Sequence, residues 1–302
     1  MKYFVTGASG WIGAAVTADL ISHGHQVVGL ARSDDSAAKI RAAGAEVFRG
    51  SIDEPEALRA PAEASDGVIH LAFNHDFSAH ETAIATDRAV MTVLLDSLAG
   101  SDRPFVFASG VLGKAAPGVL STEDTIIDPA TAASPRIVNG QLALDYADRG
   151  VRTVAVAFAP TVHGEGDHGF MSSYVAMDRL TGAAGFVGDG SNTWPAVNIA
   201  DAAALVALAV DKAPAGSVWH AVAEQGVRHL DIAKAIGRGT GLPVRPFAEG
   251  EVVDKAPQFA WLERFLGVSA LASSEKTQGL LGWTPTHPTL VEDLDAGYYT
   301  RA

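Results

Sequence analysis

The chain has 302 residues, of which 48% are apolar and 19% charged. This composition excludes a disordered, collagen-like or coiled-coil protein and suits one large α/β domain or a nucleotide-binding domain with a smaller companion. The net charge of −13 disfavours nucleic acid and anionic membranes as partners, because both would repel the chain. The sequence has no cysteine, which excludes disulfides, thiol nucleophiles and cysteine-ligated zinc.

The N-terminus predicts a core strand rather than a targeting segment. Residues 2–7 read KYFVTG and lack the basic start and long apolar stretch of a signal peptide. The most apolar helical stretch, residues 202–210, is too short to span a bilayer, which takes about 20 residues. We therefore expect a cytoplasmic protein.

Strand-length apolar runs alternate with amphipathic helical patterns through the first half of the chain. The predicted strands cover residues 3–6, 26–31, 45–48, 67–72, 104–109 and 152–158. The predicted helices cover residues 12–22, 35–43, 54–62, 80–98 and 136–148. This alternation predicts an α/β fold, a doubly wound parallel (Rossmann) sheet with helices on both faces.

The second half is richer in glycine and proline and predicts a smaller lobe. Asp201 is expected to cap a helix over residues 202–210, a further strand is expected over 218–222, and mostly short helices and turns follow from 224. We predict a dinucleotide-binding domain formed by residues 1–163 plus 196–223. Residues 164–195 plus 224–302 would form the substrate-binding lobe.

A glycine pattern follows the first predicted strand and begins the first predicted helix. Gly7 would permit the tight turn, Gly10 would let the backbone approach a pyrophosphate, and Gly13 would allow close helix–strand packing. The free N–H groups of the helix N-terminus favour phosphate at this position. The alternative is a glycine-rich turn without a ligand.

The end of the second predicted strand indicates which cofactor is bound. A site for NAD(H) usually has Asp or Glu there, about 20 residues after the glycines, to hold the ribose 2′-hydroxyl. This sequence has Ala31, Arg32 and Ser33 instead. Because Arg32 can pair with a 2′-phosphate, NADP(H) is favoured over NAD(H). Alternatively, Arg32 is a solvated surface residue.

An ordered set of motifs over nearly the whole chain resembles the extended short-chain dehydrogenase/reductases. The motifs are TGASGWIG, VIHLA, FVFASG, APTVHG, VNIADAAALVALAV and LLGWTP. GDGSNTWPAV and TVHGEGDHGF further resemble an atypical branch whose members keep the cofactor fingerprint but lack the usual active-site residues. The resemblance implies an NAD(P)-binding Rossmann fold.

The resemblance also implies cofactor contacts at particular positions. The pyrophosphate would be lined by Gly7, Ser9, Gly10, Trp11 and Ile12, and the adenine would be approached by Ser51 and Ile52. Leu71, Ala72 and Phe73 would pass along the middle of the cofactor, and Pro160, Thr161 and Val162 would border the nicotinamide.

The catalytic Tyr-x-x-x-Lys of the family has no match here. Counting back from the segment at residues 149–153 puts the Lys position on Arg136 and the Tyr position on Ala132. Arg136 could hold the ribose or a substrate anion, but it is a poor proton relay because it stays protonated. Ser109 lies near the family's Ser/Thr position, although strand-anchored counting puts Gly110 there. The usual tyrosine-based mechanism is therefore not supported.

Other side chains are candidates for the missing proton donor. His163 and His168, with Asp167 between them, follow the sixth strand, where doubly wound sheets bind ligands. The alternative for such a histidine is a loop residue bonded to a backbone carbonyl. Tyr174 could reach the cleft or pack in the core. Residues 74–76 (Asn-His-Asp) follow the fourth strand and could face the substrate. A metal site is not expected, and no GxSxG motif of a serine hydrolase is present.

The leading hypothesis is an NADP(H)-dependent oxidoreductase that reduces a carbonyl, enone or imine in a small, mostly apolar molecule. Hydride chemistry belongs to the cofactor, so the protein has mainly to orient and polarise the substrate. A non-catalytic NADP(H)-binding sensor and, less favoured, a nucleotide-sugar epimerase or dehydratase are the alternatives. Enzymes of the resembled family often pair through helices that flank the sheet. The resemblance is therefore compatible with a homodimer.

Overall fold

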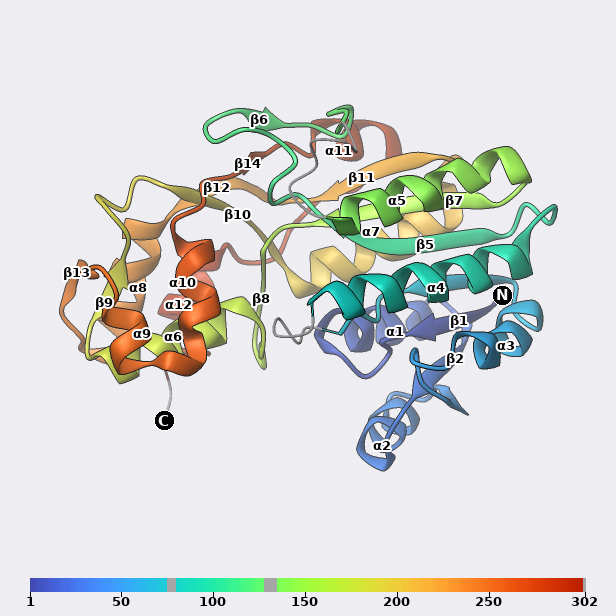
Figure 1. Ribbon diagram of the computed structural model, residues 1–302, viewed down its shortest axis with the longest axis horizontal. Coiled ribbons are helices and arrows are strands. Elements are labelled where there is room, and N and C mark those ends of the chain that lie inside the picture. The colour runs from blue at the N-terminus through green and yellow to red at the C-terminus, as the bar shows by residue number, and fades with distance from the viewer. Residues whose placement is uncertain (75–79, 128–134, 301–302) are drawn as a thin grey trace.

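A parallel sheet of seven strands forms the centre of the larger part of the molecule (Figure 1). The computed structural model describes residues 1–74, 80–127 and 135–300. In spatial order the strands are β11 (Ser217–Ala221), β7 (Arg152–Phe158), β5 (Pro104–Gly110), β4 (Gly67–His70), β1 (Lys2–Thr6), β2 (Gln26–Ala31) and β3 (Glu46–Arg49). The chain runs outward in both directions from β1 and β4, so the predicted doubly wound α/β sheet is confirmed.

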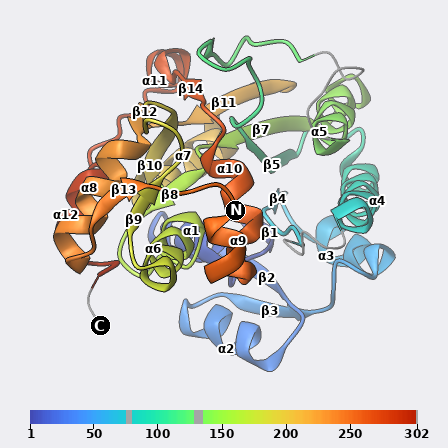
Figure 2. The same cartoon turned by 60° about the vertical axis from the view of Figure 1, so that its left-hand side comes forward.

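Helices cover both faces of this sheet, because its central strands are apolar on both sides. One face carries α1 (Trp11–Ser22), α2 (Asp34–Ala42), α7 (Ile199–Lys212) and α11 (Glu275–Leu281). The other carries α3 (Arg59–Glu63), α4 (His80–Leu98), α5 (Pro135–Asp145) and the 3₁₀ helices Pro55–Leu58 and Tyr146–Arg149. Figure 2 shows α4 and α5 together on one side and α1 and α7 on the other.

A smaller lobe lies beside the carboxyl ends of the strands and has its own apolar core (Figure 1). Its helices are α6 (Phe170–Thr181), α8 (His229–Thr240), α9 (Glu251–Lys255), α10 (Ala260–Leu266), α12 (Leu290–Asp295) and the 3₁₀ helix Pro257–Phe259. Short sheets accompany them: β8 (Thr161–His163), β10 (Thr193–Asn198) and β12 (Glu224–Arg228); β9 (Ala184–Phe186) and β13 (Val244–Pro246); β6 (Leu120–Ser121) and β14 (Leu271–Ala272). The predicted domain boundaries remain a prediction.

Several local predictions need correction. The helix expected at residue 202 begins at Ile199, and its N-cap is Asn198, whose side chain accepts a hydrogen bond from the Ala200 N–H at 3.0 Å. Asp201 is therefore inside the first turn, where its buried carboxylate accepts hydrogen bonds from the Thr286 and His287 N–H groups, both at 3.0 Å. The region after 224, predicted as mostly short helices and turns, instead begins with a strand and a 12-residue helix.

Candidate functional site

The glycine-rich turn between β1 and α1 has no room for side chains at two positions. Gly7 has a φ of +73°, and a Cβ there would lie 2.8 Å from the Ala72 nitrogen. A Cβ on Gly13 would lie 2.0 Å from the Gly7 carbonyl oxygen. Gly10 is exposed at the N-cap of α1, and no side chain caps the free N–H groups of this helix. A bare turn with uncapped N–H groups fits a pyrophosphate.

The ends of two adjacent strands lie next to this turn. β1 and β4 pair in parallel, and it is between these two strands that the direction of winding reverses, which is where open α/β sheets bind ligands. Leu71, Ala72 and Phe73 leave β4 at this edge, all half-buried. The Ala72 N–H donates to Thr6 Oγ1 at 3.2 Å, which fixes this segment against the turn.

Arg32 follows β2 and extends into solvent. No carboxylate in the described part of the chain forms an ion pair with it. The nearby acidic residue Asp34 is instead paired with Arg49, which lies opposite Ala31 in the β2–β3 register. Arg32 and Arg49 thus both border the end of β2, and only Arg32 was identified from the sequence.

Trp11 joins the glycine-rich turn to the segment that follows β7. Its indole Nε1–H donates to the Val162 carbonyl at 2.8 Å, although the two residues lie 151 positions apart. Thr161 is buried, and its hydroxyl donates to the Pro195 carbonyl at 2.6 Å, whereas Pro160 is half-buried. Cofactor contacts by Pro160, Thr161, Val162, Ser9, Ile12, Ser51 and Ile52 remain predictions.

Arg136 is the second residue of α5 and the position that the sequence comparison matched to the family's Lys. Its guanidinium carbon lies 3.9 Å above the centre of the Phe73 ring, so α5 and the end of β4 meet at this residue. Burial lowers the pKa of Arg136, and the negative charge of Asp87 opposes that shift. Arg136 thus presents a permanent positive charge beside the segment expected to follow the cofactor.

Asp87 belongs to a buried hydrogen-bonded chain that leads from α5 to the glycine-rich turn. Its carboxylate accepts a hydrogen bond from Asn139 Nδ2 at 3.0 Å and lies 3.4 Å from His70 Nε2. The other ring nitrogen of His70 lies 2.8 Å from Thr6 Oγ1. Burial alone would raise the pKa of Asp87, but His70, Arg136 and Asn139 lower it below its ordinary value. An ionised carboxylate therefore lies behind Arg136.

Asp87, His70 and Asn139 were missed in the sequence, although one signal was available. Asp87 lies three residues after Ile84 and four before Met91, on the buried face of α4. A carboxylate at a core position of a helix needs a buried partner. Its hydrogen-bond partners, His70 and Asn139, lie 17 and 52 positions away in the chain, so the pairing requires the fold.

Of the family's remaining catalytic positions, Ser109 stays a prediction. Ala132, the position matched to Tyr, lies outside the described residues. Ser109 is half-buried near the end of β5, and Gly110 is exposed, with open space where its Cβ would be. Tyr146 lies beyond α5 and donates to Asp96 at 2.9 Å.

Two candidates for the proton donor, Tyr174 and His163, are fully buried, which argues against that role. Tyr174 has no exposed surface, and its hydroxyl donates to the Gly185 carbonyl at 2.6 Å. Burial raises the pKa of Tyr174 well above its ordinary value. His163 is also fully buried, and its Nδ1 lies 2.6 Å from an Asp293 carboxylate oxygen. Neither side chain can reach a substrate in this conformation.

The other proposed proton donors differ in position. His168 is exposed, its Nδ1 lies 3.4 Å from the Gly166 carbonyl, and its ring packs edge-on against Trp11 with centroids 5.7 Å apart. Asn74 is exposed at the end of the β4 segment. His75 and Asp76 lie outside the described residues.

Half-buried aromatic side chains form a wall of the smaller lobe. The Phe170 ring, at the start of α6, lies 5.4 Å from the Trp261 ring and 5.6 Å from the Phe265 ring, both on α10. Leu112, in the segment after β5, packs against the same core. The loop that follows the central strand β5 therefore packs against the apolar core of the smaller lobe.

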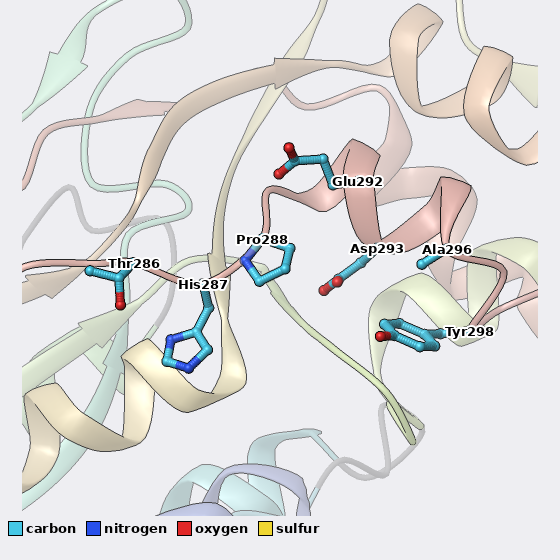
Figure 3. Close-up of a pocket in the computed structure, with 7 residues that line it drawn as sticks. All are labelled: Thr286, His287, Pro288, Glu292, Asp293, Ala296 and Tyr298. Atoms are coloured by element: carbon cyan, nitrogen blue, oxygen red, sulfur yellow. The ribbon is translucent and has the colours of Figure 1, made fainter.

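The pocket in Figure 3 does not include the glycine-rich turn or the neighbouring strand ends. Its lining residues are Thr286, His287, Pro288, Glu292, Asp293, Ala296 and Tyr298, and none comes from the glycine-rich turn or a strand end. We therefore assign the site to the strand ends and the turn. In the described residues no group of three or more His, Asp or Glu side chains could hold a metal ion. Every described helix is too short or too polar to cross a lipid bilayer.

The fold and the turn define an NAD(P)-dependent enzyme of the extended short-chain dehydrogenase/reductase type. Residues 3–221 match the model of the NAD dependent epimerase/dehydratase family, and the chain belongs to that family.

Similar proteins share both sequence and fold with this chain. It is 41% identical to the uncharacterized protein YLL056C of Saccharomyces cerevisiae, over 99% of both chains. It is 40% identical to an uncharacterized protein of Schizosaccharomyces pombe, over 99% of this chain and 100% of that one. A UDP-glucose 4-epimerase structure from Thermotoga maritima shares the fold, with a TM-score of 0.77, 21% identity and coverage of 99% and 97% of the two chains.

Proposed function

We propose that the chain is an NADP(H)-dependent oxidoreductase that reduces a carbonyl, enone or imine bond in a small, mostly apolar molecule. The preference for NADP(H) is supported by Arg32, which follows β2 where sites for NAD(H) carry a carboxylate. Asp34, the acid closest to it in sequence on α2, is paired with Arg49. A 2′-phosphate would therefore meet positive charge at this strand end.

The observation that carries the proposal is Arg136 at the start of α5. Bound NADPH would supply a hydride, and the substrate oxygen or nitrogen would gain negative charge as it arrives. A guanidinium that packs over the Phe73 ring and interacts electrostatically with the Asp87 carboxylate can stabilise that charge without changing its own protonation. Solvent would then supply the proton.

The same observation disfavours sugar epimerisation. Oxidising a sugar hydroxyl requires a base that accepts its proton, and a guanidinium stays protonated at physiological pH. Tyr174 and His163 are buried away from solvent and bonded to other groups. Reduction needs only a positive charge beside the substrate oxygen or nitrogen, and the protonated guanidinium of Arg136 supplies one.

The smaller lobe supports an apolar substrate. Phe170, Trp261 and Phe265 contribute aromatic surface. Arginines that could bind a sugar diphosphate are instead engaged by carboxylates within the described part of the lobe: Arg228–Asp231 at 2.8 Å, Arg238–Asp295 at 2.8 Å and Arg245–Glu251 at 2.6 Å.

The direct test is consumption of NADPH with a panel of aldehydes, ketones, enones and imines, using Arg136→Met as the diagnostic variant. Losing a charge that stabilises the transition state should lower kcat by about 100-fold, while the Kd for NADPH changes only a few-fold. Arg149→Met is the matched control, because Arg149 also lies over an aromatic ring, that of Tyr146 at 4.1 Å, and pairs with a carboxylate, Asp96, at 2.9 Å.

Arg149→Met should retain wild-type turnover. Tight NADPH binding without turnover of any substrate would refute the reductase proposal and favour a non-catalytic NADP(H)-binding protein. An Arg136→Met variant with unchanged kcat would refute the role of Arg136.

A further inference from the structure

The C-terminal segment of the chain, residues 290–300, contacts the strand β8 and the loop 164–169 through buried polar side chains. Asp293 of α12 bonds His163, the last residue of β8, across 130 positions of sequence. Tyr299, just beyond α12, bonds Gly164, the first residue of the loop, across 135 positions. Figure 3 shows Asp293 projecting inward from α12. These contacts lie outside the residues assigned above to substrate chemistry.

Tyr299 holds the loop at two points. Its hydroxyl oxygen accepts a hydrogen bond from the Gly164 N–H at 3.0 Å, and its O–H donates to the Asp167 carboxylate at 3.0 Å. The other Asp167 oxygen accepts from the Gly169 N–H at 2.6 Å. Gly164 and Gly166 have φ values of +149° and +87°, a backbone conformation that glycine adopts readily, and these hydrogen bonds help to hold the loop in it.

Asp293 fixes the strand that enters this loop. The His163 ring is fully buried and bonds Asp293 at 2.6 Å, and the Asn198 side-chain amide donates to the same carboxylate at 3.2 Å. His163 Nε2 has no hydrogen-bond partner among the described residues. Since Asp293 holds this ring in place, losing its carboxylate would loosen the end of β8 where the loop begins, although β8 stays paired with β10.

The loop and strand in turn contact the glycine-rich turn through Trp11. The Val162 carbonyl, next to His163, accepts the Trp11 indole N–H at 2.8 Å. The ring of His168 packs edge-on against the same indole. Trp11 is the first residue of α1, the helix whose N-terminus faces the predicted pyrophosphate position. A continuous path of contacts therefore runs from the C-terminal segment to the cofactor turn.

We propose that Tyr299 and Asp293 are positioning residues for the cofactor, which set the loop 164–169 and, through Val162 and Trp11, the geometry of the phosphate-binding turn. The inference rests on the cofactor site of the proposed function. It does not depend on the substrate or on turnover. Loosening the C-terminal contacts should weaken dinucleotide binding although none of these side chains belongs to the glycine-rich turn.

The test is Tyr299→Phe, which removes one hydroxyl and keeps the ring. Hydrogen exchange of the backbone amides in residues 162–169 should accelerate by at least tenfold without cofactor, since the Gly164 N–H loses its acceptor. The Kd for NADPH by calorimetry should rise about tenfold, and tryptophan emission should change because Trp11 loses its fixed surroundings. Tyr146→Phe is the matched control: it also loses a tyrosine–carboxylate bond, to Asp96 at 2.9 Å, on the opposite face of the sheet. It should change none of the three readouts.

Asp167→Asn is a second variant in case Tyr299→Phe fails to fold, because it weakens the acceptor for the Tyr299 O–H while the Gly164 bond remains. It should shift the same readouts in the same direction by a smaller factor. Accelerated exchange with a wild-type Kd would refute the coupling to the cofactor, and unchanged exchange would refute the role of Tyr299. Failure of every substrate in the reductase panel would leave these results intact, so the two proposals fail separately.

Discussion

Gly13→Ala places one methyl group where the glycine-rich turn has no space. The added Cβ would lie 2.0 Å from the Gly7 carbonyl oxygen and 2.7 Å from its carbon. Unstrained contacts between heavy atoms lie near 3.5 Å, so the turn and α1 must separate by more than about 1 Å. Overpacking of this kind costs about 1–3 kcal/mol. Alanine recovers about 0.5–1 kcal/mol of that in a helix, which leaves a net loss of up to about 2.5 kcal/mol.

The assay combines urea unfolding with calorimetric titration of NADPH. The variant should lose stability by that amount, and its Kd should rise at least tenfold because the phosphate-binding N–H groups move with the turn. Gly279→Ala is the control, since Gly279 lies in α11 with no atom within 4 Å of its Cβ position. It should gain about 0.5–1 kcal/mol and bind NADPH as the wild type does. A Gly13→Ala variant with wild-type affinity would refute the assignment of the turn.

Three further predictions concern single side chains. Arg32→Asp should weaken NADPH binding and strengthen NADH binding. Parallel titrations with NADPH and NADH measure both Kd values, and an unchanged ratio of the two would contradict the prediction. Burial lowers the pKa of His229 to about 4, so stability should fall by about 3 kcal/mol as the pH drops from 6.5 to 4; His229→Phe should flatten the unfolding free energy over that range, and an unchanged slope would contradict this. Burial raises the pKa of Asp178 well above its ordinary value, so the stability present at low pH is lost as the pH rises and the carboxyl ionises. Asp178→Asn should therefore raise the melting temperature more at pH 8 than at pH 5, and an equal shift at both would argue against a neutral carboxyl.

Local sequence patterns predicted the fold because the hydrophobic pattern of each strand and helix is contained within a few neighbouring residues. The strands over 26–31 and 152–158 and the helix over 80–98 have the predicted bounds. The helix at Ile199 shows where this approach is limited: Asp201 is a good N-cap residue, but its carboxylate bonds Thr286 and His287 instead. Those partners lie more than 80 positions away, so no local pattern could identify them.

The sequence identified the residues of the candidate site whose type is required by the local backbone conformation. It missed the contacts that depend on side chains far apart in the chain. Gly7 and Gly13 are required by the turn itself. His163 was a candidate proton donor because it follows a strand end, yet Asp293 from α12 buries and binds it. Asp87 was missed because its role depends on Arg136 and His70, which other elements supply.

The most direct measurement of the central claim is transfer of deuterium from NADPH that carries deuterium at both hydrogen positions of the nicotinamide C4, followed by mass spectrometry of the product. For a substrate found in the panel, the wild type should place one deuterium on a carbon of the reduced bond. Arg136→Met should form that product about 100-fold more slowly, and Arg149→Met at the wild-type rate. Product without deuterium, or equal rates for the wild type and Arg136→Met, would contradict a reductase that uses Arg136 to polarise its substrate.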